Sequence, residues 1–208
     1  MHVLIMAATA MELNHQAGLI RSGQGLRISF LITGIGMVST AYHLTRKIIE
    51  DRPNLAIQAG IGGVNDKGRI SETYIIREDY FSDLGVLEKG QFKSLFEMGL
   101  AGADEFPFRQ GKLPNPYLAE FPQIGLQKAS GKTVNQISSG PVLEEENEIL
   151  IESMEGAAFH YTCLLEKIPF LQIRAVSNLI GERDKSKWKM QESLTSLHEA
   201  LQSVIENI

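Results

Sequence analysis

The stretch from residue 148 to residue 184 constrains the fold of this chain more than any other. Residues 148–153 form a short apolar run with β-branched side chains, which predicts a strand, and Phe170–Val176 predict a second, buried strand. Between them, apolar residues recur at helical spacing from residue 157 to residue 168, and Pro169 ends that helix. The pattern is typical of a strand–helix–strand unit in a parallel sheet.

Polar side chains follow both strands of this unit. Met154 and Glu155 come directly after the first strand, and Ser177 and Asn178 after the second. Because parallel sheets collect their ligand groups at the carboxyl ends of strands, we expect these side chains to lie close together. A carboxylate accepts hydrogen bonds and a carboxamide both donates and accepts them. The pair therefore predicts a polar ligand that carries both donors and acceptors.

Short segments in this region carry a family resemblance. Ser-Met-Glu-Gly-Ala-Ala at residues 153–158, followed by Arg-Ala-Val-Ser-Asn at residues 174–178, resembles the signature of the purine nucleoside phosphorylase and nucleosidase superfamily. Leu-Ile-Gly-Glu-Arg-Asp at residues 179–184, with Trp188, is similar to one branch, the futalosine hydrolases of menaquinone biosynthesis. In that superfamily the Met-Glu pair grips the ribose hydroxyls, and the Ser-Asp or Ser-Asn pair meets the purine.

The resemblance implies roles for individual residues. Glu155 would hold the 2′- and 3′-hydroxyls of a ribose, because a bidentate acceptor suits two donors, and Met154 would pack against the sugar. Glu12, at the nucleosidase spacing from the first strand, would activate the attacking water. Asn178 would meet a 6-oxopurine such as the hypoxanthine of futalosine, and Arg183 would bind the benzoate carboxylate of that substrate.

Each of these residues also has a structural alternative. Glu12 and Glu155 stand at predicted helix starts, where the helix dipole stabilises a carboxylate. Asn178 can bond only to its local turn, and Arg183 can serve the electrostatics of a helix start. His160 follows the ribose motif closely and is a further candidate for the pocket lining.

Two glycine-rich turns follow predicted strands. Residues 34–36, Gly-Ile-Gly, lack the third glycine of a dinucleotide fingerprint, because Ser39 occupies its place, and they predict a tight turn rather than a Rossmann cofactor site. Gly60, Ile61 and Gly62 form the second turn. In related enzymes a turn at this place lets the backbone approach the ribose or the base.

The nucleophile is predicted from what the chain lacks relative to phosphorylases. Phosphorylases have an arginine and a serine for phosphate where this sequence has Gln58 and Ile61, and a glycine where it has Ala7. A phosphate site needs backbone N–H groups with a cation or hydroxyl nearby. These differences favour water over phosphate.

Alternation of strands and helices predicts an α/β fold, a three-layer αβα sandwich around a central mixed, largely parallel sheet. The resemblance refines this to a nucleoside phosphorylase-like fold, and we expect one domain over residues 1–208. The last helix has Leu194, Leu197, Leu201, Val204 and Ile208 on one face, and Asp184 or Ser186 is expected to cap it. Further strands are predicted at His2–Ala8, Arg27–Thr33, Leu55–Ala59, 69–79 and Lys132–Ser138, and a helix from Met37 to Asp51.

Composition excludes several classes of function. A net charge of −5 argues against a nucleic-acid partner, and Cys163 is the only cysteine, which rules out a disulfide framework and a thiolate metal site. The chain has no apolar run of about 20 residues for a membrane span, and it enters a strand without the basic start of a secretory signal. We expect a soluble cytoplasmic protein that uses neither a metal nor an organic cofactor.

The resemblance implies an N-ribosyl hydrolase that releases hypoxanthine and dehypoxanthinyl futalosine from futalosine. The resemblance also implies a homodimer or higher homo-oligomer. The alternatives are a methylthioadenosine/S-adenosylhomocysteine or aminodeoxyfutalosine nucleosidase, a purine nucleoside phosphorylase, and a non-catalytic nucleoside-binding protein. Asn178 argues against an adenosine-type nucleosidase, which has aspartate there, and Ala7, Gln58 and Ile61 argue against a phosphorylase.

Overall fold

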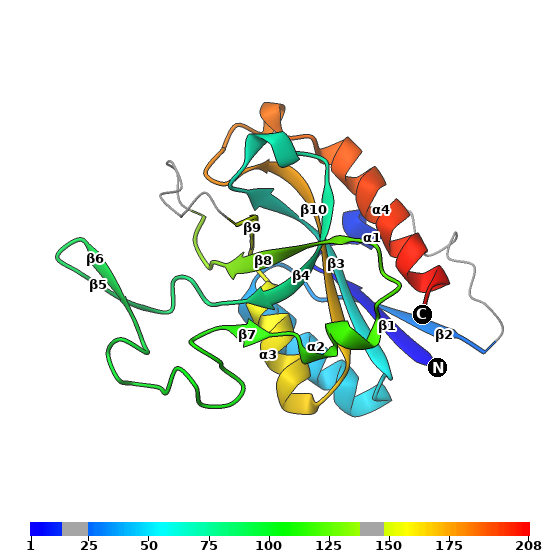
Figure 1. Ribbon diagram of the computed structural model, residues 1–208, viewed down its shortest axis with the longest axis horizontal. Coiled ribbons are helices and arrows are strands. Elements are labelled where there is room, and N and C mark those ends of the chain that lie inside the picture. The colour runs from blue at the N-terminus through cyan, green and yellow to red at the C-terminus, as the bar shows by residue number, and fades with distance from the viewer. Residues whose placement is uncertain (14–24, 138–147) are drawn as a thin grey trace.

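The computed structural model describes residues 1–13, 25–137 and 148–208, which form an α/β structure around a mixed sheet (Figure 1). The strands are β1 (His2–Ala7), β2 (Arg27–Ile32), β3 (Leu55–Val64), β4 (Thr73–Asp79), β5 (Gly85–Glu88), β6 (Gln91–Ser94), β7 (Leu113–Pro114), β8 (Gln127–Thr133), β9 (Leu150–Ser153) and β10 (Phe170–Leu179). The helices are α1 (Ala10–Leu13), α2 (Met37–Asp51), α3 (Gly156–Glu166) and α4 (Met190–Glu206), with 3-10 turns η1 (Lys67–Arg69), η2 (Pro116–Glu120) and η3 (Lys185–Lys187).

The main sheet has the strand order β10-β4-β8-β9-β3-β1-β2. Because β3 also pairs directly with β10, the strands β3, β10, β4, β8 and β9 close into a ring, and β1 and β2 extend from β3. The pairs β1–β2, β1–β3, β3–β10, β4–β8 and β8–β9 are parallel, whereas β4–β10, β3–β9 and β4–β7 are antiparallel. The predicted α/β class with a mixed sheet is therefore confirmed.

The direction of β9 differs from the prediction. β9 runs antiparallel to β3, with Gly63 opposite Glu152, whereas β10 runs parallel to β3. The two strands that flank α3 consequently point in opposite directions, and the predicted parallel strand–helix–strand unit is wrong. The periodicity of a segment identifies a strand but not its partner, and the direction of β9 is set by its pairing with β8 and β3.

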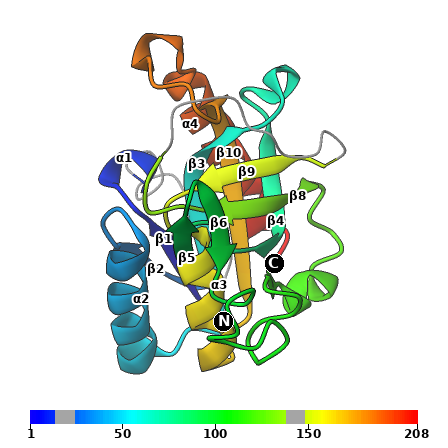
Figure 2. The same ribbon diagram turned by 90° about the vertical axis from the view of Figure 1, so that its left-hand side faces the viewer.

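Helices pack on both faces of β1, because alternate side chains of a strand point to opposite sides. Val3 and Ile5 face a core cluster that includes Leu197 of α4. Leu4 and Met6 face a second cluster that contains Leu44 and Ile48 of α2 and Phe159 and Cys163 of α3. Figure 2 shows α2 and α3 on the near side of the sheet, with α4 behind the strands. Each fully buried aliphatic side chain contributes about 1.5–3 kcal/mol.

Cys163 lies in this second cluster with no exposed surface, as predicted for a small buried hydrophobe. Burial raises the pKa of its thiol well above the ordinary value. Among the described helices, none is long and apolar enough to cross a membrane.

Several predicted boundaries of strands and helices differ from those in the structure. β3 does not stop at Ala59 but continues through the glycines to Val64, and β8 spans Gln127–Thr133 instead of beginning at Lys132. Ser138, the predicted end of that strand, lies outside the described residues. Asp184 caps η3, where its carboxylate accepts a hydrogen bond from the Ser186 amide, and the N-cap of α4 is Lys189, which makes no side-chain capping bond.

Candidate active site

A pocket of about 330 Å³ opens among the turn after β1, the middle of β3, the end of β9 and the end of β10. Seven of the predicted site residues line it: Glu12, Ile61, Gly62, Met154, Glu155, Asn178 and Arg183. The remaining one, Gly60, is buried beneath the lining. Much of the rest of the wall is apolar and comprises Ala8, Met11, Ile35, Val134, Ile137, Trp188, Met190 and Leu194.

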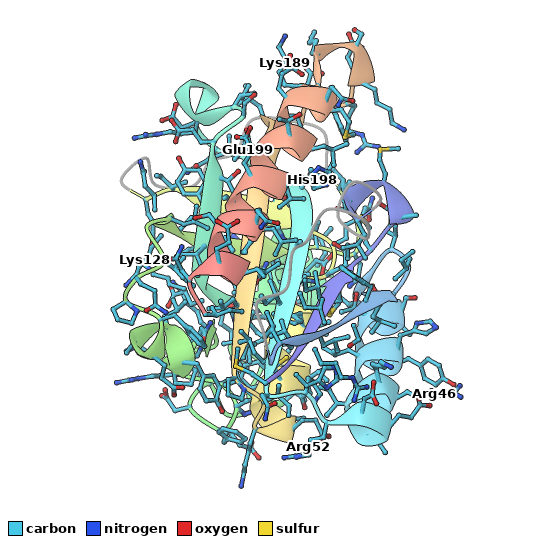
Figure 3. All side chains as sticks on the ribbon, turned by 90° about the vertical axis from the view of Figure 1, so that its right-hand side faces the viewer. Arg46, Arg52, Lys128, Lys189, His198 and Glu199 are labelled. Carbon is cyan, nitrogen blue, oxygen red and sulfur yellow. The ribbon has the colours of Figure 1, made fainter. Side chains whose placement is uncertain are left out.

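Glu12 enters the pocket from the first turn of α1. Its Oε2 accepts hydrogen bonds from the Thr9 amide at 2.9 Å and the Thr9 hydroxyl at 2.8 Å, as the acid of a helix capping box does. Its Oε1 accepts a hydrogen bond from the Ile61 amide of β3 at 3.2 Å. Figure 3 shows His198 on the side of α4 that faces α1, where its Nε2 lies 3.1 Å from the Glu12 carbonyl oxygen. Both the backbone and the side chain of Glu12 are thus fixed.

Glu155 reaches the same pocket from the N-cap position of α3. Its Oε1 accepts a hydrogen bond from the Gly36 amide at 3.0 Å, and its Oε2 lies 3.8 Å from Nη2 of Arg174. Arg174 is a fully buried residue of β10 whose Nη2 also donates to Gln58 Oε1 at 2.9 Å. The Glu155 carboxylate is therefore held between a backbone donor and a buried cation, a stronger arrangement than a neutral hydrogen bond alone.

Glycines in β3 allow the neighbouring groups to approach closely. A Cβ atom on residue 60 would lie 2.1 Å from Arg174 Nη1 and 3.1 Å from Glu12 Oε1, and one on residue 62 would lie 2.8 Å from the Glu152 carbonyl oxygen of β9. The predicted glycine turn is therefore a strand segment on which side chains converge from several elements. This is a recognised use of glycine inside a strand.

Asn178 is aimed by an irregularity in β10. The register between β10 and β3 shifts between Val176 and Asn178, and a bulge of this kind re-aims a side chain. Asn178 Oδ1 accepts a hydrogen bond from the Ser177 hydroxyl at 2.7 Å, and Nδ2 donates to the Leu179 carbonyl at 2.7 Å. Asn178 thus makes the bonds to its local turn that a purely structural role would require. Its amide nitrogen nevertheless carries two protons, and one of them remains available to a ligand.

Arg183 lies in the loop between β10 and η3, which forms one rim of the pocket. The loop is fixed by Trp188, whose Nε1 donates to the Glu182 carbonyl at 3.1 Å. The Lys187 ammonium, 2.9 Å from the Glu182 carboxylate, lowers the pKa of that carboxyl. Arg183 is exposed and stands before η3, seven residues ahead of α4, so it does not serve the start of α4.

The three residues that are predicted to replace the phosphate ligands of phosphorylases are buried or apolar. Ala7 ends β1 with no exposed surface, and Gln58 is buried in β3, where its side chain bonds to Arg174. Ile61 presents an apolar side chain to the pocket. In the described ranges, no group of three His, Cys, Asp or Glu side chains is arranged to hold a metal ion.

Two site residues escaped the prediction, and one candidate is wrong. The sequence places Arg174 in a buried strand and gives it no role in the site, although it belongs to the motif at residues 174–178. It predicts the turn at residues 34–36 but not the hydrogen bond from the Gly36 amide to Glu155. His160 does not line the pocket: it is fully buried in α3, and its Nδ1 lies 2.9 Å from the Leu113 carbonyl oxygen.

The fold and the sequence are similar to those of known nucleosidases. The structure matches futalosine hydrolase of Helicobacter pylori with a TM-score of 0.81 at 13% identity, over 100% of this chain and 98% of that chain. It also matches the methylthioadenosine/S-adenosylhomocysteine nucleosidase of Streptococcus pneumoniae, bound to a transition-state inhibitor, with a TM-score of 0.79 at 16% identity, over 100% and 99% of the two chains.

No protein-family model matches the chain. Among curated proteins, it is 29% identical to futalosine hydrolase of Thermus thermophilus over 194 residues, which are 89% of this chain and 84% of that protein. It is 26% identical to futalosine hydrolase of Streptomyces coelicolor, over 97% of this chain and 94% of that protein. Along most of its length, the chain is thus similar to the futalosine hydrolases that residues 153–184 resemble.

Proposed function

We propose that this chain is an N-ribosyl hydrolase that cleaves the glycosidic bond of futalosine and so takes part in menaquinone biosynthesis. One observation carries the proposal. Glu12, Glu155 and Asn178 converge on a single pocket, in a chain that is similar to two curated futalosine hydrolases over most of its length. The products would be hypoxanthine and dehypoxanthinyl futalosine.

Each side chain would serve a separate part of the reaction. As the bond from C1′ to the base breaks, positive charge builds on the ribose and negative charge moves onto the purine. The Glu155 carboxylate would accept hydrogen bonds from the 2′- and 3′-hydroxyls and stabilise the developing cation. Glu12 would take one proton of the water that attacks C1′. Asn178 would donate its free N–H to the departing hypoxanthine.

Water as the nucleophile is supported by the wall beside Glu12. A phosphate at that place would need a cation or hydroxyl donor, and Ile61 supplies only an apolar side chain and an amide already bonded to Glu12. A second, negatively charged group next to the Glu12 carboxylate would also be repelled.

The apolar part of the pocket suits the benzoate-bearing 5′ side of futalosine. Met11, Ile35 and Met190 would pack against the aromatic ring, and the exposed guanidinium of Arg183 at the rim would bind the carboxylate. Met154 would lie against the sugar.

A second candidate has support of its own. The chain is 26% identical to a methylthioadenosine/S-adenosylhomocysteine nucleosidase of Haemophilus ducreyi, over 73% of this chain and 67% of that protein. A substrate panel separates the two activities: purified protein is incubated with futalosine, inosine and methylthioadenosine, and kcat/KM is measured for each. We expect the highest value for futalosine. A higher value for methylthioadenosine would replace the first assignment by the second.

In architecture, we place the chain with the nucleoside phosphorylase-like folds, as one three-layer αβα domain over residues 1–208 that works in the cytoplasm. We further propose a homodimer. The β5–β6 hairpin projects from the body (Figure 1) and carries exposed Val86, Leu87 and Phe92, an apolar surface of the kind that a second copy covers. Light scattering on the purified protein tests this, and a monomer at micromolar concentration would contradict it.

A further inference from the structure

The first turn of α3 carries Glu155, and its backbone amides are bonded by side chains from outside the helix. Glu155 is the N-cap residue but makes no side-chain capping bond. The Gly156 amide donates to the Ser153 hydroxyl at 3.2 Å, and the Ala157 amide donates to the Thr133 hydroxyl at 2.7 Å. An N-cap side chain usually accepts such a bond. Because Thr133 of β8 takes this part, the Glu155 carboxylate is left to face the pocket.

The Thr133 hydroxyl is anchored in turn. It has one proton, and since it accepts a hydrogen bond from the Ala157 amide, it gives that proton to Asp79 Oδ1 at 2.8 Å. Asp79 also accepts hydrogen bonds from the Tyr80 amide at 2.8 Å and from Gln172 Nε2 at 3.1 Å. The side chain has no exposed surface, so these donors replace water around the carboxylate.

Two glycines leave room for the Asp79 carboxylate. A Cβ atom on residue 131 would lie 2.2 Å from Asp79 Oδ2, and one on residue 156 would lie 2.1 Å from the same oxygen. Glycine at both positions therefore lets Asp79 lie against β8 and against the first residue of α3. A carboxylate at this end of a helix also faces the positive end of the helix dipole.

We propose that Asp79 and Thr133 are positioning residues that hold the first turn of α3, and with it the Glu155 carboxylate, in the geometry required to bind the ribose hydroxyls. The inference rests on the proposed function, because it takes Glu155 as the group that binds the ribose. Neither residue lines the pocket. They act through the Ala157 amide, two residues beyond Glu155.

The test compares futalosine with its 2′-deoxy analogue, which lacks one hydroxyl that Glu155 would bind. Thr133→Val keeps the shape of the side chain but removes both hydrogen bonds, whereas Thr133→Ser keeps the hydroxyl. In Thr133→Val, kcat/KM for futalosine should fall by about 10- to 100-fold, the effect of a misplacement of about 1 Å. The value for the 2′-deoxy analogue should fall much less, so the preference for the 2′-hydroxyl collapses. Thr133→Ser should restore it.

Thr40→Val is the matched control, because Thr40 is equally buried and its hydroxyl makes no hydrogen bond within the described part of the chain. This variant should keep the preference for the 2′-hydroxyl. If Thr133→Val does not fold, Asp79→Asn is measured in the same way and should weaken the preference.

Two results contradict the inference in different ways. If wild type prefers futalosine over the 2′-deoxy analogue and the folded Thr133→Val or Asp79→Asn variant prefers it equally, the network is only structural. If wild type itself shows no preference, Glu155 does not bind the 2′-hydroxyl, and this part of the proposed function fails together with the inference.

Discussion

The proposal gives the Glu12 carboxylate a catalytic role, the deprotonation of water, in addition to the structural role that its hydrogen bonds show. Oε2 closes the turn at Thr9, and Oε1 lies against the Ile61 amide. A glutamine can serve the structural role at Thr9, since capping boxes accept either residue. Deprotonation of water requires the carboxylate, so the two roles are separable by one substitution.

We therefore predict that Glu12→Gln loses the hydrogen bond from the Ile61 amide but still folds, and that it turns futalosine over about 10²–10⁴-fold more slowly, the usual range for a positioned acid–base group. Substrate affinity should change far less. Glu192→Gln, on the exposed start of α4, is the matched control and should retain activity. Near-normal turnover in Glu12→Gln would reduce Glu12 to a capping residue.

The substitution Asn178→Asp tests whether Asn178 binds the purine base. Nδ2 donates to the Leu179 carbonyl, so a carboxylate oxygen at this place would face that carbonyl and also N7 and O6 of hypoxanthine, all acceptors. Such a mismatch costs about 1–3 kcal/mol, roughly 5- to 150-fold in rate. The ratio of kcat/KM for futalosine over its 6-amino analogue should fall by this factor. An unchanged ratio would show that Asn178 does not read the base.

At the residue scale, the sequence predicts Glu155 and Asn178 because they stand within short motifs, and Glu12 because of its spacing from the first strand. Arg174 stands in the motif at residues 174–178, but the sequence does not show that its side chain is buried beside Glu155 and Gln58. Only the structure shows that Gly60 makes room for its guanidinium and that Glu155 and Gln58 bind it. The roles of Glu12, Glu155 and Asn178 remain predictions that these variants test.

At the scale of elements, side chains of the site converge on β3, and among the glycines of this strand an added Cβ atom would be most crowded at Gly60. In Gly60→Ala the new Cβ would lie 2.1 Å from Nη1 of the fully buried Arg174. We expect a loss of about 1–3 kcal/mol in the free energy of unfolding, together with lower turnover. The Arg174 side chain cannot move away from the new Cβ atom without breaking its hydrogen bond to Gln58. Gly125→Ala, where nothing lies within 4 Å, should change neither. Equal stabilities of the two variants in urea would refute this packing.

Two buried titratable groups, His160 of α3 and Asp79 of β4, predict opposite effects of pH. Burial lowers the pKa of His160 from 6.5 to about 4, so its contribution to stability is present above pH 6.5 and is lost as the pH falls towards 4. Burial raises the pKa of Asp79 from 3.8 to about 6, so its contribution is present below pH 3.8 and is lost as the pH rises through 6. Each difference corresponds to about 3 kcal/mol.

Urea unfolding of wild type, His160→Gln and Asp79→Asn between pH 4 and pH 7 measures these contributions. The stability advantage of wild type over His160→Gln should grow by about 3 kcal/mol as the pH rises, and its advantage over Asp79→Asn should shrink by a similar amount. Curves that stay parallel across this range would show that neither group titrates differently in the folded protein.

The elements themselves were largely predictable, and their directions were not. The periodicity of α2, α3 and α4 gave those helices, and continuous apolar runs gave β1 and most of β10. The antiparallel direction of β9 depends on contacts with β8 and β3, distant in sequence, which no local pattern encodes. Glu155 and Asn178 line one pocket because β9 pairs antiparallel with the end of β3, and not because two parallel strands end side by side.

At the scale of the whole molecule, the pocket joins parts of the chain that are far apart in sequence. Glu12 comes from the first turn after β1, Glu155 from the start of α3 and Asn178 from the end of β10. These elements are held together by β3, which pairs with β1, β9 and β10. The fold therefore brings to one pocket the three side chains to which the proposal assigns the general base, the ribose acceptor and the base-binding amide.

The most direct test of this account is product analysis by mass spectrometry after incubation of the pure protein with futalosine in phosphate-free buffer. The account predicts free hypoxanthine and dehypoxanthinyl futalosine in equal amounts, at a rate that added phosphate does not increase. A strict requirement for phosphate with a ribosyl 1-phosphate product, or intact futalosine after prolonged incubation with folded protein, would contradict it.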